Sequence, residues 1–334
     1  MTRLSAPAEV PQLETRVSPP DSLSTSVPRQ WRLAVLFAVS IPTLYNRTDW
    51  PPLENWATIF LALSLQALPF LVLGVIVSAM LSAFVTPRAL AKVVPKGLVA
   101  SVGTAAIAAT ALPGCECSSV PVANRLLSRG VRPAAALTFL LAAPAINPVV
   151  VIATTVAFPG RPEMALARFG ASILAAVVVG LIWGVMFESI PIRTSHHEHE
   201  GSGMQRFSSA AVHDFVQAGG YLIVGASIVA TIQTVVPPRT LASLGGSGLL
   251  AIAIMAVAAV VLSMCSEGDA FVAAGLSQFS LTSRLVFLVV GPMIDIKLVA
   301  MQTGAFGKSF VARFAPLTFV VALASSLVVA WIIL

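Results

Sequence analysis

The sequence predicts an all-α polytopic membrane protein with about nine transmembrane helices, because it is strongly apolar and its apolar runs are long. Of the 334 residues, 57% are hydrophobic and only 10% are charged, and the mean hydropathy is +0.91. A soluble domain carries about 25% charged residues. The net charge of +6 therefore does not indicate nucleic-acid binding, and we expect the lipid bilayer and a small-molecule substrate as partners.

Nine apolar runs are candidates for spans, because about 20 helical residues cross a hydrocarbon core of roughly 30 Å. The first run is short and contains Pro42. Two further stretches, 115–131 and 266–281, are too polar and too interrupted to cross as ordinary helices, so we predict half-helices or re-entrant turns there. The nine runs are 31–46, 55–85, 97–114, 134–158, 165–189, 208–236, 247–265, 284–304 and 314–334.

The chain is predicted to consist of two transmembrane halves and a polar linker. A tail rich in Pro, Ser and Thr, residues 1–30, is expected to be disordered. The linker carries three histidines and two glutamates that could bind a divalent metal, but a solvated flexible segment is the favoured interpretation. The parts are 31–189 (repeat core 55–158), the linker 190–207 with His196, His197, Glu198, His199 and Glu200, and 208–334 (repeat core 208–304).

The distribution of Lys and Arg predicts that the N-terminus is cytoplasmic. The expected location of the protein is the plasma membrane. With this orientation the inner segments hold fourteen Lys and Arg residues and the outer segments hold five, as the positive-inside rule requires. Lys297 is left inside a span. The outer five are Arg47, Arg161, Arg168, Arg239 and Arg284.

The two halves resemble each other in sequence. "QALPFLVLG" from Gln66 matches "QAGGYLIVG" from Gln217 at an offset of 151 residues. Farther along, "CSSVP" from Cys117 matches "CSEGD" from Cys265 at an offset of 148. The Gln66 and Gln217 helices are expected to run in opposite directions, so the repeat is predicted to be inverted. The later offset also pairs Pro144 with Pro292 and Asn147 with Asp295.

Inverted repeats with helices broken at matched places are typical of secondary transporters, whose substrate site lies near the bilayer midplane where the breaks meet. A break is tolerated at that depth when it faces a cavity rather than lipid. We therefore expect the substrate site where 113–121 meets 263–269. The residues predicted to contact substrate are Cys115, Glu116, Cys117, Ser118, Ser119, Asn147, Cys265 and Ser266.

The three cysteines allow two interpretations. Cysteine in a span is often only a small buried hydrophobic residue. Cys117 and Cys265, however, occupy matched positions at the two breaks, and Cys115 lies two residues away. Thiolates select soft ions, and three of them could hold trivalent arsenic or antimony, or Cu(I). We therefore treat Cys115, Cys117 and Cys265 as candidate ligands of a soft metal or metalloid.

Charged residues within the predicted spans form a second group. On insertion scales, placing one such charge at the centre of a membrane helix is unfavourable by about 2.5–3.5 kcal/mol. These residues are therefore expected to be paired, hydrated or neutral. We assign them to proton or ion coupling. The alternative is a structural pair between Lys297 and an aspartate, although Asp295 and Lys297 would point to different faces of a regular helix. The group comprises Glu267, Asp269, Asp295 and Lys297.

One segment resembles a known family. The stretch "PGCECSSVPVANRLLSRGVRPAAALTFLLAAPAINPVVV" is similar to the ArsP-type predicted permease family, especially in "CECSSVPVA" and "FLLAAPAINP", and the similarity covers roughly residues 55–334. The resemblance implies a permease, and it implies efflux of trivalent organoarsenicals as in characterised members. It also implies that Cys115, Cys117 and Cys265 are the substrate thiols.

The favoured function is a secondary-transport permease that exports a small soft-metalloid or thiol-reactive solute, with trivalent organoarsenicals as a candidate, by alternating access. No nucleotide-binding motif is present, so an ion gradient is the expected energy source, and no cofactor is expected. One alternative keeps the fold and carries a transition-metal ion or a small sulfur-containing anion. An alternative of another class is a membrane thiol–disulfide redox protein that uses Cys115 and Cys117.

Overall fold

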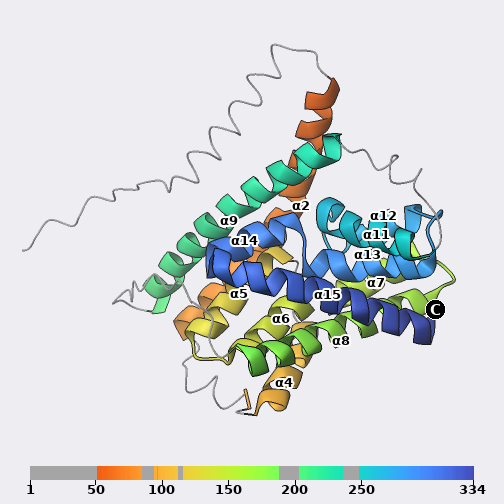
Figure 1. The fold of residues 1–334 in the computed structure, drawn as a ribbon. Coiled ribbons are helices and arrows are strands. Elements are labelled where there is room, and N and C mark those ends of the chain that lie inside the picture. Colours follow the sequence, from red (N-terminus) through yellow and green to blue (C-terminus); the bar gives the residue numbers. More distant parts are fainter. Residues whose placement is uncertain (1–50, 85–93, 96, 112–115, 188–202, 236–247) are drawn as a thin grey trace, which may run out of the picture.

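The computed structural model describes residues 51–84, 94–95, 97–111, 116–187, 203–235 and 248–334, and these form helices without any strand (Figure 1). Helices are the expected kind of element for a bilayer, because a helix satisfies all its backbone hydrogen bonds internally. The helices are α2 (Pro51–Phe84), α4 (Leu98–Ala111), α5 (Glu116–Ser128), α6 (Pro133–Ile146), α7 (Pro148–Ala157), α8 (Pro162–Met186), α9 (Gly203–Val235), α11 (Leu249–Leu262), α12 (Gly268–Gly275), α13 (Leu281–Met293), α14 (Ile296–Phe306) and α15 (Lys308–Ile333).

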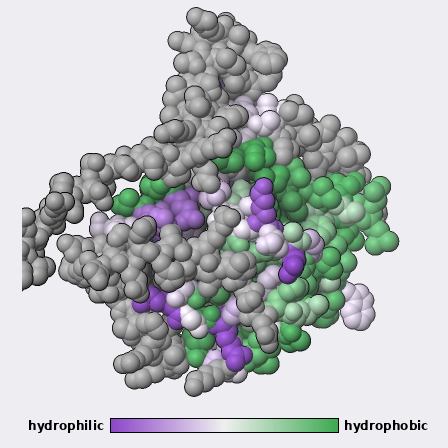
Figure 2. Space-filling view, turned by 60° about the vertical axis from the view of Figure 1, so that its left-hand side comes forward, coloured by the Kyte–Doolittle hydropathy of each residue, from purple (hydrophilic) through white to green (hydrophobic). Residues whose placement is uncertain are grey.

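The predicted class, a polytopic membrane protein, agrees with this structure. Within the described residues, six segments are long and apolar enough to cross a membrane, and α4 and α11 are shorter apolar helices. Large hydrophobic side chains lie on the outside, for example Leu249 at 83% exposure and Trp331 at 88%. Figure 2 shows hydrophobic residues over much of the described surface, as expected for a surface in contact with lipid. The expected span 31–46, the tail and most of the linker lie outside the described residues.

The core is formed by α6 and α13. Every residue from Ala134 to Ile146 is buried in α6, and every residue from Leu285 to Met293 is buried in α13. A helix that is apolar on all sides is expected in the interior. The helices α8 and α15 pack on this pair, while α2 and α9 pack on each other, with α9 along one side of the bundle (Figure 1).

Two expected spans, 134–158 and 284–304, are interrupted rather than continuous. Asn147 separates α6 from α7 in extended backbone (φ −69°, ψ 157°), and its side chain accepts a hydrogen bond from Val150 N at 2.9 Å. Pro148 follows it and fits the first position of a new helix, because it has no N–H to offer the previous turn. Asp295 separates α13 from α14 in the same way and accepts from Leu298 N at 2.6 Å.

The two polar stretches form short helices, as half-helices were expected to do. The 115–131 stretch contains α5, with 13 residues, and the 266–281 stretch contains α12, with 8 residues. Residues 263–267 are not helical and connect α11 to α12. The corresponding break before α5, at 112–115, lies outside the described residues.

Helix bounds in the two halves follow the sequence offsets. Shifting α4 by 151 residues gives 249–262, the bounds of α11, and shifting α2 gives 202–235, within one residue of α9. The start of α6 shifted by 148 gives 281, the start of α13. The contacts between α2 and α9 are antiparallel, since Trp56 bonds Thr231 at 2.9 Å and Ser78 bonds Asp214 at 2.6 Å. These relationships support the predicted inverted repeat, which stays a prediction.

Candidate functional site

A cluster of buried polar side chains lies where the helices are interrupted. Each of its members is at most 4% exposed. Because a buried polar or charged group without a partner is unfavourable by several kcal/mol, the cluster must be held together by its own hydrogen bonds and ion pairs. Its members, which we call the buried polar cluster, are Glu116, Asn147, Thr154, Arg168, Ser263, Ser266, Asp269, Asp295 and Lys297.

The two segments predicted to contain the breaks, 113–121 and 263–269, contact each other in this cluster through their described residues. The hydroxyl of Ser266, between α11 and α12, donates to Glu116 Oε1 in the first turn of α5, with 3.1 Å between the oxygens. A carboxylate in the first turn of a helix is favoured by the helix dipole. Ser119 donates to the Glu116 carbonyl at 2.9 Å and so closes the same turn. The sequence therefore located the two segments that come together.

Arg168 is the member that the sequence analysis misplaced. It was counted among the outer surface charges, but it lies within α8 at 1% exposure. Its guanidinium donates to Thr154 Oγ1 at 2.7 Å and to the Ser266 carbonyl at 2.6 Å, which links α7, α8 and the break before α12. The signal was available, because Arg168 is three residues inside the predicted span 165–189.

Three carboxylates surround this arginine at interaction distance: those of Asp269, Glu267 and Glu116. Asp269 is also held by neutral donors, since its Oδ2 accepts from Ser263 Oγ at 2.5 Å and its Oδ1 accepts from Met264 N at 2.9 Å. Both carboxyl oxygens of Glu267 are buried without a hydrogen-bond partner among the described residues. Arg168 is thus the central cation of a mainly acidic interior, and Glu267 is its least satisfied acid.

Lys297 forms an ion pair with Asp295. Its Nζ lies 3.1 Å from Asp295 Oδ2 and donates to the Met264 carbonyl. The expectation that these two side chains point to different faces was wrong, because Asp295 precedes α14 in extended backbone instead of belonging to it (φ −132°, ψ 172°). Of the two pairings considered for Lys297, the structure therefore has the one with Asp295.

Cys265 lies beside the cluster and contacts the other half of the chain. Gln66 Nε2 of α2 donates to Cys265 Sγ at 2.8 Å, and Gly268 N donates to the same sulfur at 3.1 Å. Cys115 and the side chain of Cys117 lie outside the described residues, so the proposed three-thiol set stays a prediction. No group of three His, Cys, Asp or Glu residues suited to a metal occurs in the described part of the chain. Gln66 entered the sequence analysis only as part of the repeat.

Three predicted substrate residues have structural partners. Asn147 uses its side chain to cap α7 and to donate to the Ala143 carbonyl at 3.2 Å. Ser118 is buried where α5 crosses α2 so closely that a Cβ on Gly74 would lie 2.3 Å from Ser118 Cβ. Ser119 bonds the backbone of its own helix. All three residues lie near the breaks, and these contacts do not assign a ligand to any of them.

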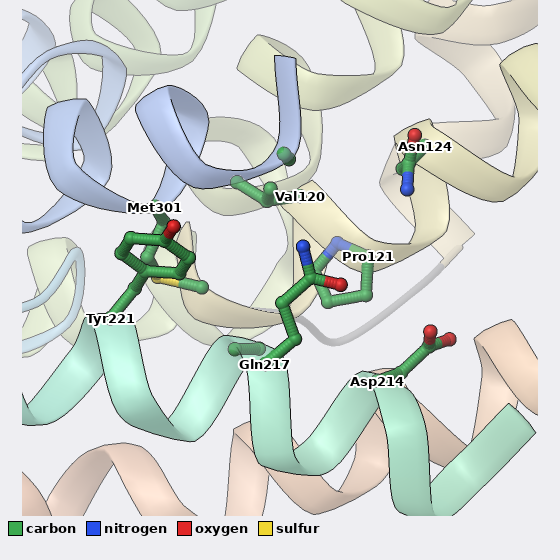
Figure 3. Close-up of a pocket in the computed structure, with 9 residues that line it drawn as sticks. Val120, Pro121, Asn124, Asp214, Gln217, Tyr221 and Met301 are labelled. Carbon is green, nitrogen blue, oxygen red and sulfur yellow. The ribbon is translucent and has the colours of Figure 1, made fainter. Parts of the chain in front are cut away.

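A small cavity lies apart from the cluster, between α5, α9 and α14 (Figure 3). Its volume is about 30 Å³, which is room for one or two water molecules. Asp214, Gln217 and Tyr221 project toward it from one face of α9, and none of them was predicted as a site residue. Asn124, Pro121 and Val120 face them from α5, and Met301 and Ala305 complete the lining.

The apolar helices, the interrupted helices and the buried charges at membrane depth together define a multi-pass membrane protein of the transport class. A family model described as "Predicted permease" matches residues 52–331. The chain therefore belongs to this permease family, which confirms the resemblance noted in its sequence.

Two relatives support the same class. The chain is 37% identical over 281 residues to the "UPF0718 protein YcgR" of Bacillus subtilis (strain 168), covering 81% of this chain and 96% of that protein. It is 35% identical over 266 residues to the "Putative two-component membrane permease complex subunit" of Streptococcus mutans serotype c (strain ATCC 700610 / UA159), and this match covers 77% of this chain and 88% of that protein. No solved structure matches the chain significantly.

Proposed function

We propose that this permease exports a small soft-metalloid or thiol-reactive solute through the site where its two helix breaks meet. The observation that carries the proposal is the contact between Ser266 and Glu116, at 3.1 Å, deep inside a chain that belongs to a permease family. Non-helical backbone at membrane depth is tolerated only where it is enclosed by protein or lines a water-filled path. A transport site is the function that explains such a break.

Alternating access is the mechanism that the architecture supports best. The helices α2 and α9 occupy corresponding places in the two halves and run antiparallel, as an inverted repeat requires. Each short helix packs on the interrupted helix of the other half, because α5 contacts α14 and α12 contacts α7. Such an exchange couples the two halves, so that motion of one half is felt at both breaks.

The cargo is inferred from the thiols. Cys265 is 8% exposed and lies at the break between α11 and α12, with its sulfur held by Gln66 and Gly268. Its sequence counterpart is Cys117, near Cys115. Soft thiol ligands favour soft ions over Mg²⁺ or Ca²⁺. Membership of a family with organoarsenical exporters makes a trivalent organoarsenical the specific candidate, with two thiols replacing its two exchangeable ligands.

Charge in the cluster supports coupling to protons. Four carboxylates, those of Glu116, Glu267, Asp269 and Asp295, share the interior with two cations, Arg168 and Lys297. Two negative charges would remain if all four acids were ionised, and an uncompensated charge of this kind is strongly unfavourable in a membrane interior. Proton uptake by Glu267 removes part of this excess. The same excess disfavours the alternative of a sulfur-containing anion as cargo.

The proposal is tested by growth protection in an arsenical-sensitive host. Cells that express the wild-type chain should tolerate trivalent methyl and aryl arsenicals better than cells with an empty vector. At matched membrane expression, the protection should be abolished by Cys265→Ser, Cys117→Ser and Glu267→Gln. Comparing Cys265→Ser with Cys265→Ala separates loss of the thiol from loss of the hydrogen bonds, because only the serine can still accept them. If well-expressed wild-type protein gives no protection, the assignment of an arsenical as the cargo is wrong, whereas membership of the permease family is unaffected.

A further inference from the structure

A second polar contact joins the two halves of the chain away from the breaks. Asp214 of α9 accepts from Arg125 of α5, with Nη2 2.9 Å from Oδ1 and Nε 3.3 Å from Oδ2. Its Oδ2 also accepts from Ser78 Oγ of α2 at 2.6 Å. One carboxylate of the second half therefore ties down two helices of the first half, and the two-point contact with arginine fixes its geometry.

This contact borders the cavity between α5, α9 and α14. Asp214 lies at one end of the lining and Tyr221 at the other, with Gln217 between them on the same face of α9 (Figure 3). The cavity is too small for a solute larger than water, at about 30 Å³. The helix α5 that Arg125 holds against α9 is also the helix that begins with Glu116 at the first break. The contact thus borders the cavity and holds in place the helix whose other end belongs to the buried polar cluster.

The corresponding contact is missing at the other end of the pair formed by α2 and α9. At the repeat offsets, Asp214 corresponds to Leu63, Ser78 to Val229 and Arg125 to Ala273. Leu63 and Val229 pack with Ala226 in a small apolar cluster. Within the described residues, the antiparallel helix pair is therefore held by a charged contact at one end, and by an apolar contact and the neutral hydrogen bond from Trp56 to Thr231 at the other.

A charged contact of this kind can form and break repeatedly as two helices approach and separate. The Arg125 and Asp214 side chains are 25% and 10% exposed, so both charges can gain water when they separate. Apolar side chains have no comparable compensation when they are pulled apart in water. Two discrete, well-defined arrangements are what a switching element requires.

We propose that Asp214, Arg125 and Ser78 form the gate at one end of the transport path, closed while the carboxylate is paired and open when α5 and α9 separate. The inference rests on the proposed transport function. The gate controls access to the cavity lined by Asn124 and Gln217, which has room only for water while the gate is closed. These three are positioning residues, because they set the distance between helices instead of holding the cargo.

The test measures access to the cavity without any transported solute. Ala218 lines the cavity, and its counterpart by the 151-residue offset is Ala67. Each is replaced by cysteine, Ala218→Cys or Ala67→Cys, in separate full-length chains. A membrane-impermeant cationic methanethiosulfonate is applied to sealed vesicles of either orientation. Mass spectrometry of the peptide that carries the new cysteine separates its labelling from that of the native thiols.

With the gate weakened by Asp214→Asn or Arg125→Gln, labelling at Ala218→Cys should rise at least tenfold from the face that also labels Arg132→Cys, because a minor open state of about 1–10% becomes dominant. Labelling at Ala67→Cys should fall from the opposite face, since opening one end closes the other. The double exchange Asp214→Arg with Arg125→Asp should restore slow labelling at position 218. Arg132→Gln is the matched control for loss of a nearby charge.

Unchanged labelling at position 218, or unchanged or increased labelling at position 67, would overturn the gate. A pair that only stabilises the fold would expose both positions together. If the single variants do not reach the membrane, a disulfide between Ser78→Cys and Asp214→Cys tests the same point, because it should suppress labelling at position 218 until it is reduced. No arm uses an arsenical, so a wrong cargo assignment leaves the result on the gate intact.

Discussion

Ser266 and Glu116 are 150 residues apart in the chain, and the hydrogen bond between them, 3.1 Å long, is buried between the first turn of α5 and the non-helical segment 263–267. Arg168 holds the same junction from a third direction through the Ser266 carbonyl, at 2.6 Å. Ser266 thus binds an acid through its hydroxyl and a cation through its carbonyl. Because Glu116 and Arg168 belong to the first half of the chain and Ser266 to the second, this arrangement depends on both halves.

Arg168→Gln should strongly destabilise the protein. The substitution removes the central cation, leaves the Thr154 and Ser266 acceptors without their charged donor and leaves the nearby carboxylates uncompensated. Removing one partner from a buried network of charges typically lowers the free energy of unfolding by about 3–5 kcal/mol. Thermal unfolding of the purified protein in detergent measures the effect. Arg313→Gln, at an exposed arginine, should leave the transition unchanged within error, and equal transitions for the two variants would contradict the role of Arg168.

Arg168→Lys should not restore wild-type stability. Arginine reaches two acceptors at once with its planar fork, whereas lysine is a single point charge on a flexible stem. We expect a melting transition between those of the wild type and Arg168→Gln. A fully restored transition would show that charge alone, without the fork, is sufficient.

Asp295 and Asn147 should respond differently to an exchange of acid and amide. Both cap a helix through the side-chain oxygen, so Asn147→Ala should lower the free energy of unfolding by about 0.5–2 kcal/mol. Asp295→Ala should lower it by more, about 3–5 kcal/mol, because it also leaves the buried Lys297 ammonium without its partner. Asp295→Asn keeps the cap but leaves the Lys297 ammonium without its carboxylate, 3.1 Å away in the wild type. It should therefore abolish the protection conferred by expression, while Asp295→Glu recovers part of it. An active Asp295→Asn variant would reduce the aspartate to a helix cap.

Gly74→Ala should disturb the crossing of α2 and α5, because its new Cβ would lie 2.5 Å from Ser118 Cα, an atom of the backbone. Over-packing of this kind typically lowers the free energy of unfolding by about 1–3 kcal/mol. Gly103→Ala is the matched control, since no heavy atom outside its own helix lies within 4 Å of the new Cβ. It should be neutral or slightly stabilising, because alanine favours the helix over glycine by about 1 kcal/mol. Unfolding measured side by side in detergent decides between them.

Gln66→Leu should weaken the hold on the Cys265 thiol and leave the fold intact. Gln66 belongs to α2 and is exposed, so its removal opens no core cavity, but its amide lies 2.8 Å from the sulfur. We expect slower alkylation of Cys265 by N-ethylmaleimide than in the wild type, because the reactive thiolate loses a hydrogen-bond donor, with an unchanged melting temperature. Gln66→Glu distinguishes loss of the donor from loss of bulk, because its carboxylate offers no N–H. Faster or unchanged alkylation in both variants would contradict the contact.

Composition and periodicity were sufficient for the membrane class, because the apolar runs that become α2, α8, α9 and α15 each exceed the length of a span. The contact between the two polar segments was also predictable, since the matched residues Cys117 and Cys265 mark these segments in the sequence. The repeat and the substrate site placed there stay predictions. The pairing of Lys297 with Asp295 was not, because the break at 294–295 changes which way each side chain points.

Arg168 was missed for a different physical reason. The positive-inside rule assigns arginines near helix ends to the surface, and Arg168 lies in the second turn of α8. Only its partners, Thr154 and the Ser266 carbonyl, show that it points inward, and both are contributed by segments distant in the sequence. Asp214 was missed for the same reason, because its meaning depends on Arg125 and Ser78 of the other half.

The central claim is that a thiol-reactive solute crosses the membrane through the junction of the two breaks. Its most direct test is the uptake of phenylarsonous acid by sealed proteoliposomes with and without an imposed proton gradient, for the wild type, Cys265→Ser and the control Gly103→Ala. The account predicts gradient-dependent uptake by the wild type and by Gly103→Ala, and uptake at the level of protein-free liposomes by Cys265→Ser. Uptake that is equal in all three proteins and in protein-free liposomes would contradict it.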